Sequence, residues 1–128
     1  MRVLDAGDPQ YSASGSVVAI GVFDGVHRGH EVVLSRAVSL ARQLGLSSTV
    51  ITFDPTPAEV LAPASAPKLI ATLDDRIRAF AALGVDEVRV VAFSQSASLE
   101  SAEDFVRRVV VGNCNAHTVV VGDDFQFG

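Results

Sequence analysis

The sequence contains a single cysteine, Cys114, so no disulfide bond can form within the chain. A chain without disulfides is typical of a reducing compartment, and we expect a cytoplasmic protein in which Cys114 is a small buried side chain. No apolar run reaches transmembrane length, and the first residues lack the pattern of a signal peptide. These absences exclude a disulfide scaffold and predict that the protein has no membrane partner.

Basic residues are also scarce, because ten Lys and Arg residues stand against fifteen Asp and Glu residues, for a formal net charge of -5. A broad basic face is therefore not expected, and nucleic acid is not an expected partner. The hydrophobic fraction is 48%, which is enough for the core of one domain. An acidic protein that binds polyphosphate must concentrate positive groups locally, through helix N-termini, histidines or a metal ion.

The most informative stretch is residues 21–30, Gly-Val-Phe-Asp-Gly-Val-His-Arg-Gly-His, which lies between an apolar run and a helical pattern. A strand that turns through glycines into a helix is a common phosphate site, because the helix N-terminus offers unpaired N–H groups and the positive end of its dipole. His27 and His30 are three residues apart, so both imidazoles can face one phosphate chain, and Gly29 leaves room between them.

Other kinds of site fit this stretch less well. Glycines at positions 21, 25 and 29 do not form a GxGxxG fingerprint, and no Gly-Lys-Ser/Thr follows to form a Walker A loop. A zinc site would use both histidines, but they lack the HExxH spacing and an evident third ligand. A structural turn with two exposed histidines is the remaining alternative. Two histidines framed by glycine after a strand favour the phosphate site.

Hydrophobic periodicity predicts strands at residues 16–22, 48–53, 86–92 and 118–121, and a short edge strand at residues 3–4. It predicts helices at residues 28–44, 73–83 and 101–113, with Thr72 as an N-cap and a loop over residues 58–67. The predicted buried side chains are Val33, Ala37, Leu40, Ala41 and Leu44 in the first helix, Leu73, Ile77, Phe80 and Ala81 in the second, and Phe105, Val106 and Val109 in the third. Alternating strands and helices predict an α/β fold with a Rossmann-like parallel sheet flanked by helices, whose ligands bind at the carboxyl ends of the strands.

The segment at residues 21–30 resembles the HxGH signature of the nucleotidylyltransferase superfamily, and more narrowly the adenylyltransferase module of prokaryotic bifunctional FAD synthetase. Two later stretches are similar to the same family, Thr-Phe-Asp-Pro-Thr-Pro at residues 52–57 and Val-Val-Val-Gly-Asp-Asp-Phe-Gln-Phe-Gly at residues 119–128. Three motifs in order over most of the chain make the resemblance specific. It implies an FMN adenylyltransferase, which converts ATP and FMN into FAD and pyrophosphate with Mg²⁺, in a parent enzyme that is also a riboflavin kinase.

The resemblance also implies roles for individual residues. His27 and His30 would be catalytic, stabilising charge on the α-phosphoryl group and the departing pyrophosphate. The implied nucleotide-binding residues are Gly21, Phe23, Asp24, Gly25, His27, Gly29, His30 and Asp124, and the implied flavin-binding residues are Pro55, Pro57, Asp124 and Phe127. Metal ligands stay unassigned. Thr56 departs from the family pattern, where His is usual, so the role of an imidazole at this position is in doubt.

From the residues alone, Asp123 and Asp124 could hold Mg²⁺, accept hydrogen bonds from ribose hydroxyls, or form a solvated turn. Likewise, residues 53–57 read as a stiff, extended loop because two prolines lack N–H groups. The resemblance favours a nucleotide–flavin site for Asp124 and a position beside the flavin for the loop.

In the family, a Ser/Thr-rich stretch with a phosphate-contacting Arg follows the last motif, whereas this sequence stops at Gly128. We therefore expect residues 1–128 to be an FMN adenylyltransferase domain that is incomplete at its C-terminus and lacks the riboflavin kinase domain. Its expected partners are the small molecules ATP and FMN, with self-association through an exposed strand edge. The alternatives are another HxGH nucleotidyltransferase, such as one using CTP or phosphopantetheine, and a catalytically silent nucleotide- or flavin-binding module.

Overall fold

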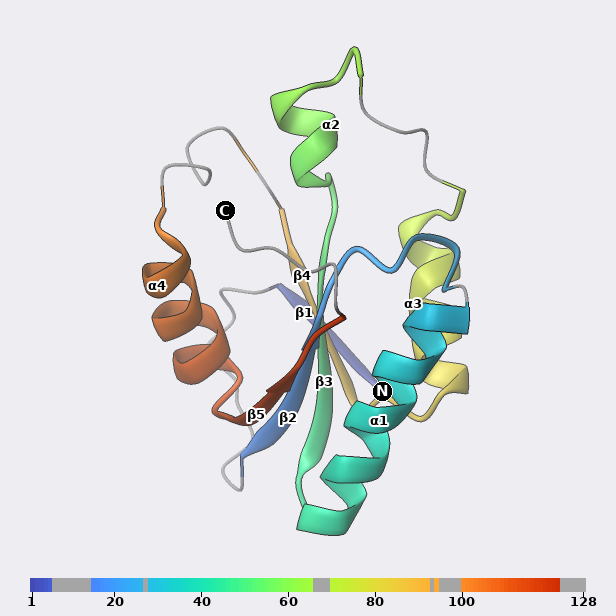
Figure 1. Ribbon diagram of the computed structural model, residues 1–128, viewed down its shortest axis with the longest axis vertical. Coiled ribbons are helices and arrows are strands. Elements are labelled where there is room, and N and C mark those ends of the chain that lie inside the picture. Colours follow the sequence, from blue (N-terminus) through green and yellow to red (C-terminus); the bar gives the residue numbers. More distant parts are fainter. Residues whose placement is uncertain (6–14, 27, 66–69, 93, 95–99, 123–128) are drawn as a thin grey trace.

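The computed structural model describes residues 1–5, 15–26, 28–65, 70–92, 94 and 100–122 (Figure 1). Within them, five strands form one sheet in the order β1-β4-β3-β2-β5. The strands are β1 (Arg2–Asp5), β2 (Ser16–Ile20), β3 (Ser47–Phe53), β4 (Glu87–Val91) and β5 (Ala116–Val120). All four strand pairs are parallel. The predicted Rossmann-like parallel sheet is therefore confirmed, including the short edge strand at the N-terminus.

Helices cover both faces of this sheet (Figure 1). α1 (Arg28–Leu44) and α3 (Leu73–Ala82) lie on one face. α4 (Ala102–Phe105) continues as a π-helical stretch, η3 (Val106–Asn113), on the other face. A short 3-10 turn, η1 (Asp24–Val26), connects β2 to α1, and α2 (Pro57–Leu61) extends beyond the sheet after β3. β2 reaches η1 and α1 at the same edge where β3 reaches α2, so both connections lie at the carboxyl edge of the sheet.

The hydrophobic core has two parts because the central strands are buried on both faces. All five residues of β2 are buried. One cluster lies against α1 and α3, and its members include Val17, Ala19, Leu34, Ala37, Val50, Phe80 and Val88. The other lies against η3 and consists of Val18, Ile20, Ile51, Val109, Val110 and Cys114. Burial raises the pKa of the Cys114 thiol to about 11, so this side chain is an inert core residue, as predicted.

The helices and strands that were predicted have the expected bounds to within two residues, but the buried faces of two helices differ in part from the prediction. In α1, Leu34 and Val38 are buried together with Ala37 and Ala41, whereas Leu44 is 44% exposed. Leu44 is the last residue of the helix, and Gly45 leaves the helix with a φ of 69°, so Leu44 lies past the packed turns.

The face that α3 buries is centred on Arg76 and Phe80, and Ala81 is exposed. Phe80 is buried and Ile77 packs against the core, as predicted, but the prediction from apolar residues did not include Arg76. Thr72 is the N-cap of α3, as predicted, and forms a capping box with Asp75. Across the described residues, no helix is both long and apolar enough to span a membrane.

Candidate active site

The predicted site lies where β2, β3 and β4 end. Two backbone hydrogen bonds extend past the strands, from Gly21 N–H to the Ile51 carbonyl and from Asp54 N–H to the Val91 carbonyl, both at 3.0 Å. The chain after β2 turns through η1 into the N-terminus of α1, and the chain after β3 leads into α2 (Figure 1). The motifs at residues 21–30 and 52–57 are therefore neighbours in space, because their strands pair directly.

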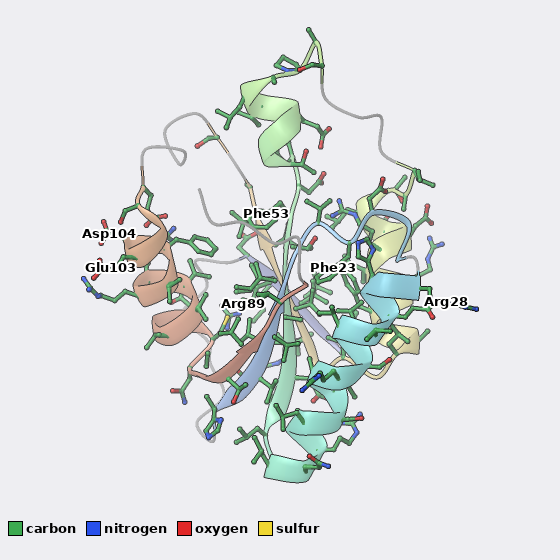
Figure 2. All side chains as sticks on the ribbon, viewed as in Figure 1. Phe23, Arg28, Phe53, Arg89, Glu103 and Asp104 are labelled. Carbon is green, nitrogen blue, oxygen red and sulfur yellow. The ribbon has the colours of Figure 1, made fainter. Side chains whose placement is uncertain are left out.

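Phe23 is the core residue of the turn after β2. Its φ is 56°, and its side chain is only 5% exposed, between the sheet and α1 (Figure 2). The ring contacts His30 and Phe80 edge to face, with centroid distances of 5.3 and 5.8 Å. A Cβ atom at Gly21 would lie 3.0 Å from the ring of Phe23, so a larger residue there would crowd the ring. Because the side chain of Phe23 is buried, only its backbone is available for the predicted contact with the nucleotide.

His30 lies in the first turn of α1 and is half-buried. Gly29 precedes it in the same turn and is exposed. The N-terminus of a helix carries the positive end of the helix dipole, so the first turn of α1 is the kind of position at which phosphate binds. His27 lies outside the described residues, so the paired action of the two imidazoles stays a prediction.

The carboxylate of Asp24 accepts hydrogen bonds from the backbone of a distant segment. Ile70 N–H donates to both carboxylate oxygens at 3.0 and 2.9 Å, and Ala71 N–H donates at 2.8 Å. The Ile70 hydrogen bond, followed by those of Ala71 and the positive charges of Arg76 and His30, lowers the pKa of Asp24 below its ordinary value. Asp24 thus anchors the approach to α3 against η1, while its predicted nucleotide contact stays a prediction.

Thr56 and Glu59 form a capping box at the start of α2. Thr56 N–H donates to Glu59 Oε1 at 3.0 Å, and Glu59 N–H donates to Thr56 Oγ1 at 3.2 Å. Pro57 is the first residue of this helix, where a missing N–H group has no cost. The expectation of an extended stretch through Pro57 and a loop at residues 58–67 is therefore wrong at residues 57–61. The Thr-x-x-Glu pattern in the sequence could have revealed this helix.

Pro55 follows a cis peptide bond from Asp54 and is exposed beyond the end of β3. The structure thus places this predicted flavin residue at the carboxyl edge, next to the turn after β2. Asp124 and Phe127 lie outside the described residues. β5, which precedes them in the sequence, pairs with β2 and ends at Val120.

Arg76 is a buried residue of the site that sequence reasoning missed. Its side chain has no exposed surface, although it stands among charged residues that suggest a solvated helix face. Nη1 donates to the Val22 carbonyl at 3.0 Å, the Thr52 hydroxyl at 3.0 Å and the Phe53 carbonyl at 3.1 Å. The pattern of the sequence carries no signal for these contacts, because they join residues from three separate elements.

Metal ligands are not gathered at this edge in the part of the chain that the structure describes. No group of three or more His, Cys, Asp or Glu side chains is placed to hold a metal ion there. The nearest candidate carboxylate, Asp24, is already engaged by the backbone of Ile70 and Ala71. The described residues alone therefore do not fit a protein-built Mg²⁺ cage.

The structure is therefore an α/β protein that brings together strand ends, a glycine turn and a helix N-terminus at the carboxyl edge of a parallel sheet, the edge where open α/β sheets generally bind ligands. The family model described as FAD synthetase matches residues 10–128 of this chain. The chain therefore belongs to the FAD synthetase family.

Several curated relatives carry the name bifunctional riboflavin kinase/FMN adenylyltransferase. The protein from Pseudomonas fluorescens is 42% identical over 89% of this chain and 36% of its own length. The protein from Escherichia coli (strain K12) is 36% identical over 93% of this chain and 38% of its own length. A relative from Geobacillus thermodenitrificans (strain NG80-2), whose name adds "putative", is 40% identical over 89% of this chain and 61% of its own length. The chain thus spans less than two thirds of each of these relatives.

Solved structures share the fold. The crystal structure of a macrolide-efflux protein from Streptococcus pneumoniae matches all of this chain and 51% of that chain, with a TM-score of 0.86 and 30% identity. The structure of a universal stress protein from Archaeoglobus fulgidus matches 89% of this chain and 80% of that chain, with a TM-score of 0.51. At 18% identity, the second likeness shows the fold alone.

Proposed function

We propose that this chain is the FMN adenylyltransferase domain of a FAD synthetase, which transfers AMP from ATP to FMN and releases pyrophosphate. The observation that carries this proposal is the pairing of β2 with β3, because the turn after β2 and the loop after β3 then leave the sheet at the same edge. In the proposal, the turn contributes the phosphate site and the loop contributes the flavin site. The names of the curated relatives support the same reaction.

In the proposed reaction, a phosphate oxygen of FMN attacks the α-phosphorus of ATP. The new O–P bond forms as the bond from the α-phosphorus to the bridging oxygen breaks in line, and pyrophosphate leaves with that electron pair. This transfer needs no protein nucleophile, so the protein contributes position and charge stabilisation. N–H groups of residues 23–25 and of the start of α1 bind phosphate oxygens. His27 and His30 donate hydrogen bonds to the α-phosphoryl group and the leaving pyrophosphate.

The flavin part of the site is proposed to include Pro55, Pro57, Asp124 and Phe127. Pro55 is exposed just after the end of β3, and this exposure supports its proposed contact with the flavin ring. Asp124 is proposed to accept hydrogen bonds near the junction of nucleotide and flavin, and Phe127 to pack on an aromatic ring. Gly21, Asp24, Gly25 and Gly29 are proposed to shape the nucleotide side through the backbone of the turn.

Mg²⁺ is proposed only as the ion that accompanies ATP, because phosphate oxygens are its preferred ligands. No step of the reaction is derived from it, since the described residues do not form a cage for it. For the whole protein, we also propose riboflavin phosphorylation on a separate domain. Self-association is proposed through β5, an edge strand whose Val119 is 42% exposed.

A single assay tests the main proposal. The purified protein is incubated with ATP, FMN and Mg²⁺, and FAD and pyrophosphate are quantified by chromatography. Equal formation of both products is expected. Parallel reactions with CTP and with phosphopantetheine test the other HxGH transferases. Binding of ATP and FMN without any FAD would identify a catalytically silent module and overturn the proposal.

A further inference from the structure

Arg76 is a charged residue whose side chain is fully buried in the core. Its side chain is completely buried on the face of α3 that also buries Phe80. Burying a guanidinium is costly unless its donors are well paired. Among the described residues, Nε and Nη2 have no hydrogen-bond partner, and the carboxylate of Asp54 lies 3.8 Å from Nη2. An apolar side chain would fill this position at lower cost, so the contacts of Nη1 are the evident reason for the arginine.

Those contacts join two chain segments that form different parts of the site. The Val22 carbonyl belongs to the turn that leads into η1, whereas the Phe53 carbonyl ends β3. The Thr52 hydroxyl donates to the same Val22 carbonyl at 3.0 Å and also accepts from Arg76. One nitrogen of α3 and one hydroxyl of β3 therefore hold the turn and the strand end together.

A second contact connects the same helix region to η1. The Asp24 carboxylate accepts from Ile70 and Ala71, just before α3 begins, and the charge of Arg76 contributes to the lowered pKa of Asp24. The turn after β2 is thus held at two residues, Val22 and Asp24, by contacts from α3 and the segment just before it. Among the contacts of the described residues, loss of Arg76 would leave the Val22 carbonyl held only by the Thr52 hydroxyl, while Asp24 stays bound to Ile70 and Ala71.

We propose that Arg76 is a positioning residue for adenylyl transfer, which fixes the glycine turn to the end of β3 and so sets the spacing between the nucleotide and the flavin. This inference rests on the proposed function. In-line attack requires the reacting atoms to meet within a narrow range of geometry, and a displacement of about 1 Å costs roughly 10²-fold in rate. Arg76 itself does not touch substrate, because its polar atoms are buried under the two segments.

The test compares Arg76→Met, Arg76→Lys and Arg78→Met in the intact protein. Methionine keeps most of the volume but donates no hydrogen bond. A lysine ammonium carries three donors on one nitrogen, which matches the three acceptors around Nη1. Arg78 is the matched control, because it lies two residues further along α3, its side chain is 77% exposed, and it forms a surface ion pair with Asp75. Steady-state FAD formation gives kcat and KM for ATP and FMN.

For Arg76→Met we expect kcat to fall about tenfold to hundredfold while both KM values stay within about threefold. Arg76→Lys should recover most of the loss, and Arg78→Met should match the wild type. An unchanged kcat in Arg76→Met, or a loss that lysine does not reduce, would overturn the proposal. Thr52→Val provides a second variant if Arg76→Met does not fold, with a smaller fall in kcat expected, and an unchanged kcat there counts against the proposal.

Hydrogen exchange separates this inference from the proposed function. Peptides covering residues 21–25 and 52–56 should exchange faster in Arg76→Met, or in Thr52→Val, than in the wild type and in Arg78→Met. Equal exchange in all proteins would show that Arg76 does not hold the segments and would overturn the inference. If the wild type forms no FAD, the proposed reaction is wrong, and so is the role of Arg76 in it. This holds even if hydrogen exchange shows that Arg76 connects the two segments.

Discussion

The imidazole of His30 and the ring of Phe23 meet edge to face, with centroids 5.3 Å apart and ring planes at 88°. Phe23 in turn contacts Phe80 of α3 at 5.8 Å, also edge to face. The orientation of one proposed catalytic imidazole is therefore set by a core residue of the turn after β2. Phe23 thus contributes both to the packing of the core and to the placement of a proposed catalytic side chain.

Replacing His30 with alanine is expected to lower kcat for FAD formation by about 10²- to 10³-fold, because one charge-stabilising donor is lost. The same size of loss is expected for His27→Ala. Thermal unfolding should change little, since His30 is only half-buried. His117→Ala is the control, because His117 is exposed on β5. Near-normal FAD synthesis by the protein lacking both His27 and His30 would contradict the assignment.

Gly21→Ala should destabilise the fold by about 1–3 kcal/mol through overpacking against the ring of Phe23. The added Cβ atom would lie between 3.0 and 3.2 Å from three ring atoms. Urea unfolding of the single and double variants with Phe23→Leu measures the coupling in a double-mutant cycle. Leucine vacates part of the ring volume, so the alanine should cost less in that background. Equal costs in both backgrounds would show that the contact with Phe23 is not the cause.

Asp24→Asn should lower stability at neutral pH, and by a smaller amount in acid. Hydrogen bonds from Ile70 and Ala71 lower the pKa of Asp24 from its ordinary 3.8, so the charged carboxylate stabilises the folded state. A depressed pKa contributes stability that is complete above the ordinary value and is lost as the pH falls through the folded value.

Urea unfolding at about pH 6 and at about pH 3 measures this difference between wild type and Asp24→Asn. Asp5→Asn is the control, because Asp5 lies exposed at the end of β1. A gap between wild type and Asp24→Asn that persists undiminished in acid would mean that the carboxylate charge is not what anchors residues 70–71.

Thr56→Ala should loosen α2 by about 1 kcal/mol, because the helix loses its N-cap and one half of the capping box. Thr56→Ser keeps the hydroxyl and should preserve the helix. Hydrogen exchange in residues 57–61 measures the local effect, and KM for FMN measures its consequence for the proposed flavin side. Identical exchange in the alanine and serine variants would indicate that Thr56 acts through its methyl group or not at all.

Much of this fold could be predicted because its signals are local. The apolar run of β2, the glycine at position 45 and the Thr72 cap each act within a few residues, and the structure confirms all three. The order of the three motifs was enough to recognise the family. The start of α2 was not predicted, although it also has a local signal, the capping pattern of Thr56 and Glu59.

The sequence by itself therefore determined the alternation of strands and helices and the parallel sheet, and it predicted a ligand site at the carboxyl edge of that sheet. Only the tertiary structure decided which side chains hold that edge together. Asp24 finds its partners 46 and 47 positions away, and Arg76 reaches Val22 across 54 positions. Periodicity and capping patterns report on neighbours along one element. Contacts between the ends of different strands and a helix exist only once the sheet has assembled, so a charged residue such as Arg76 shows its burial only there.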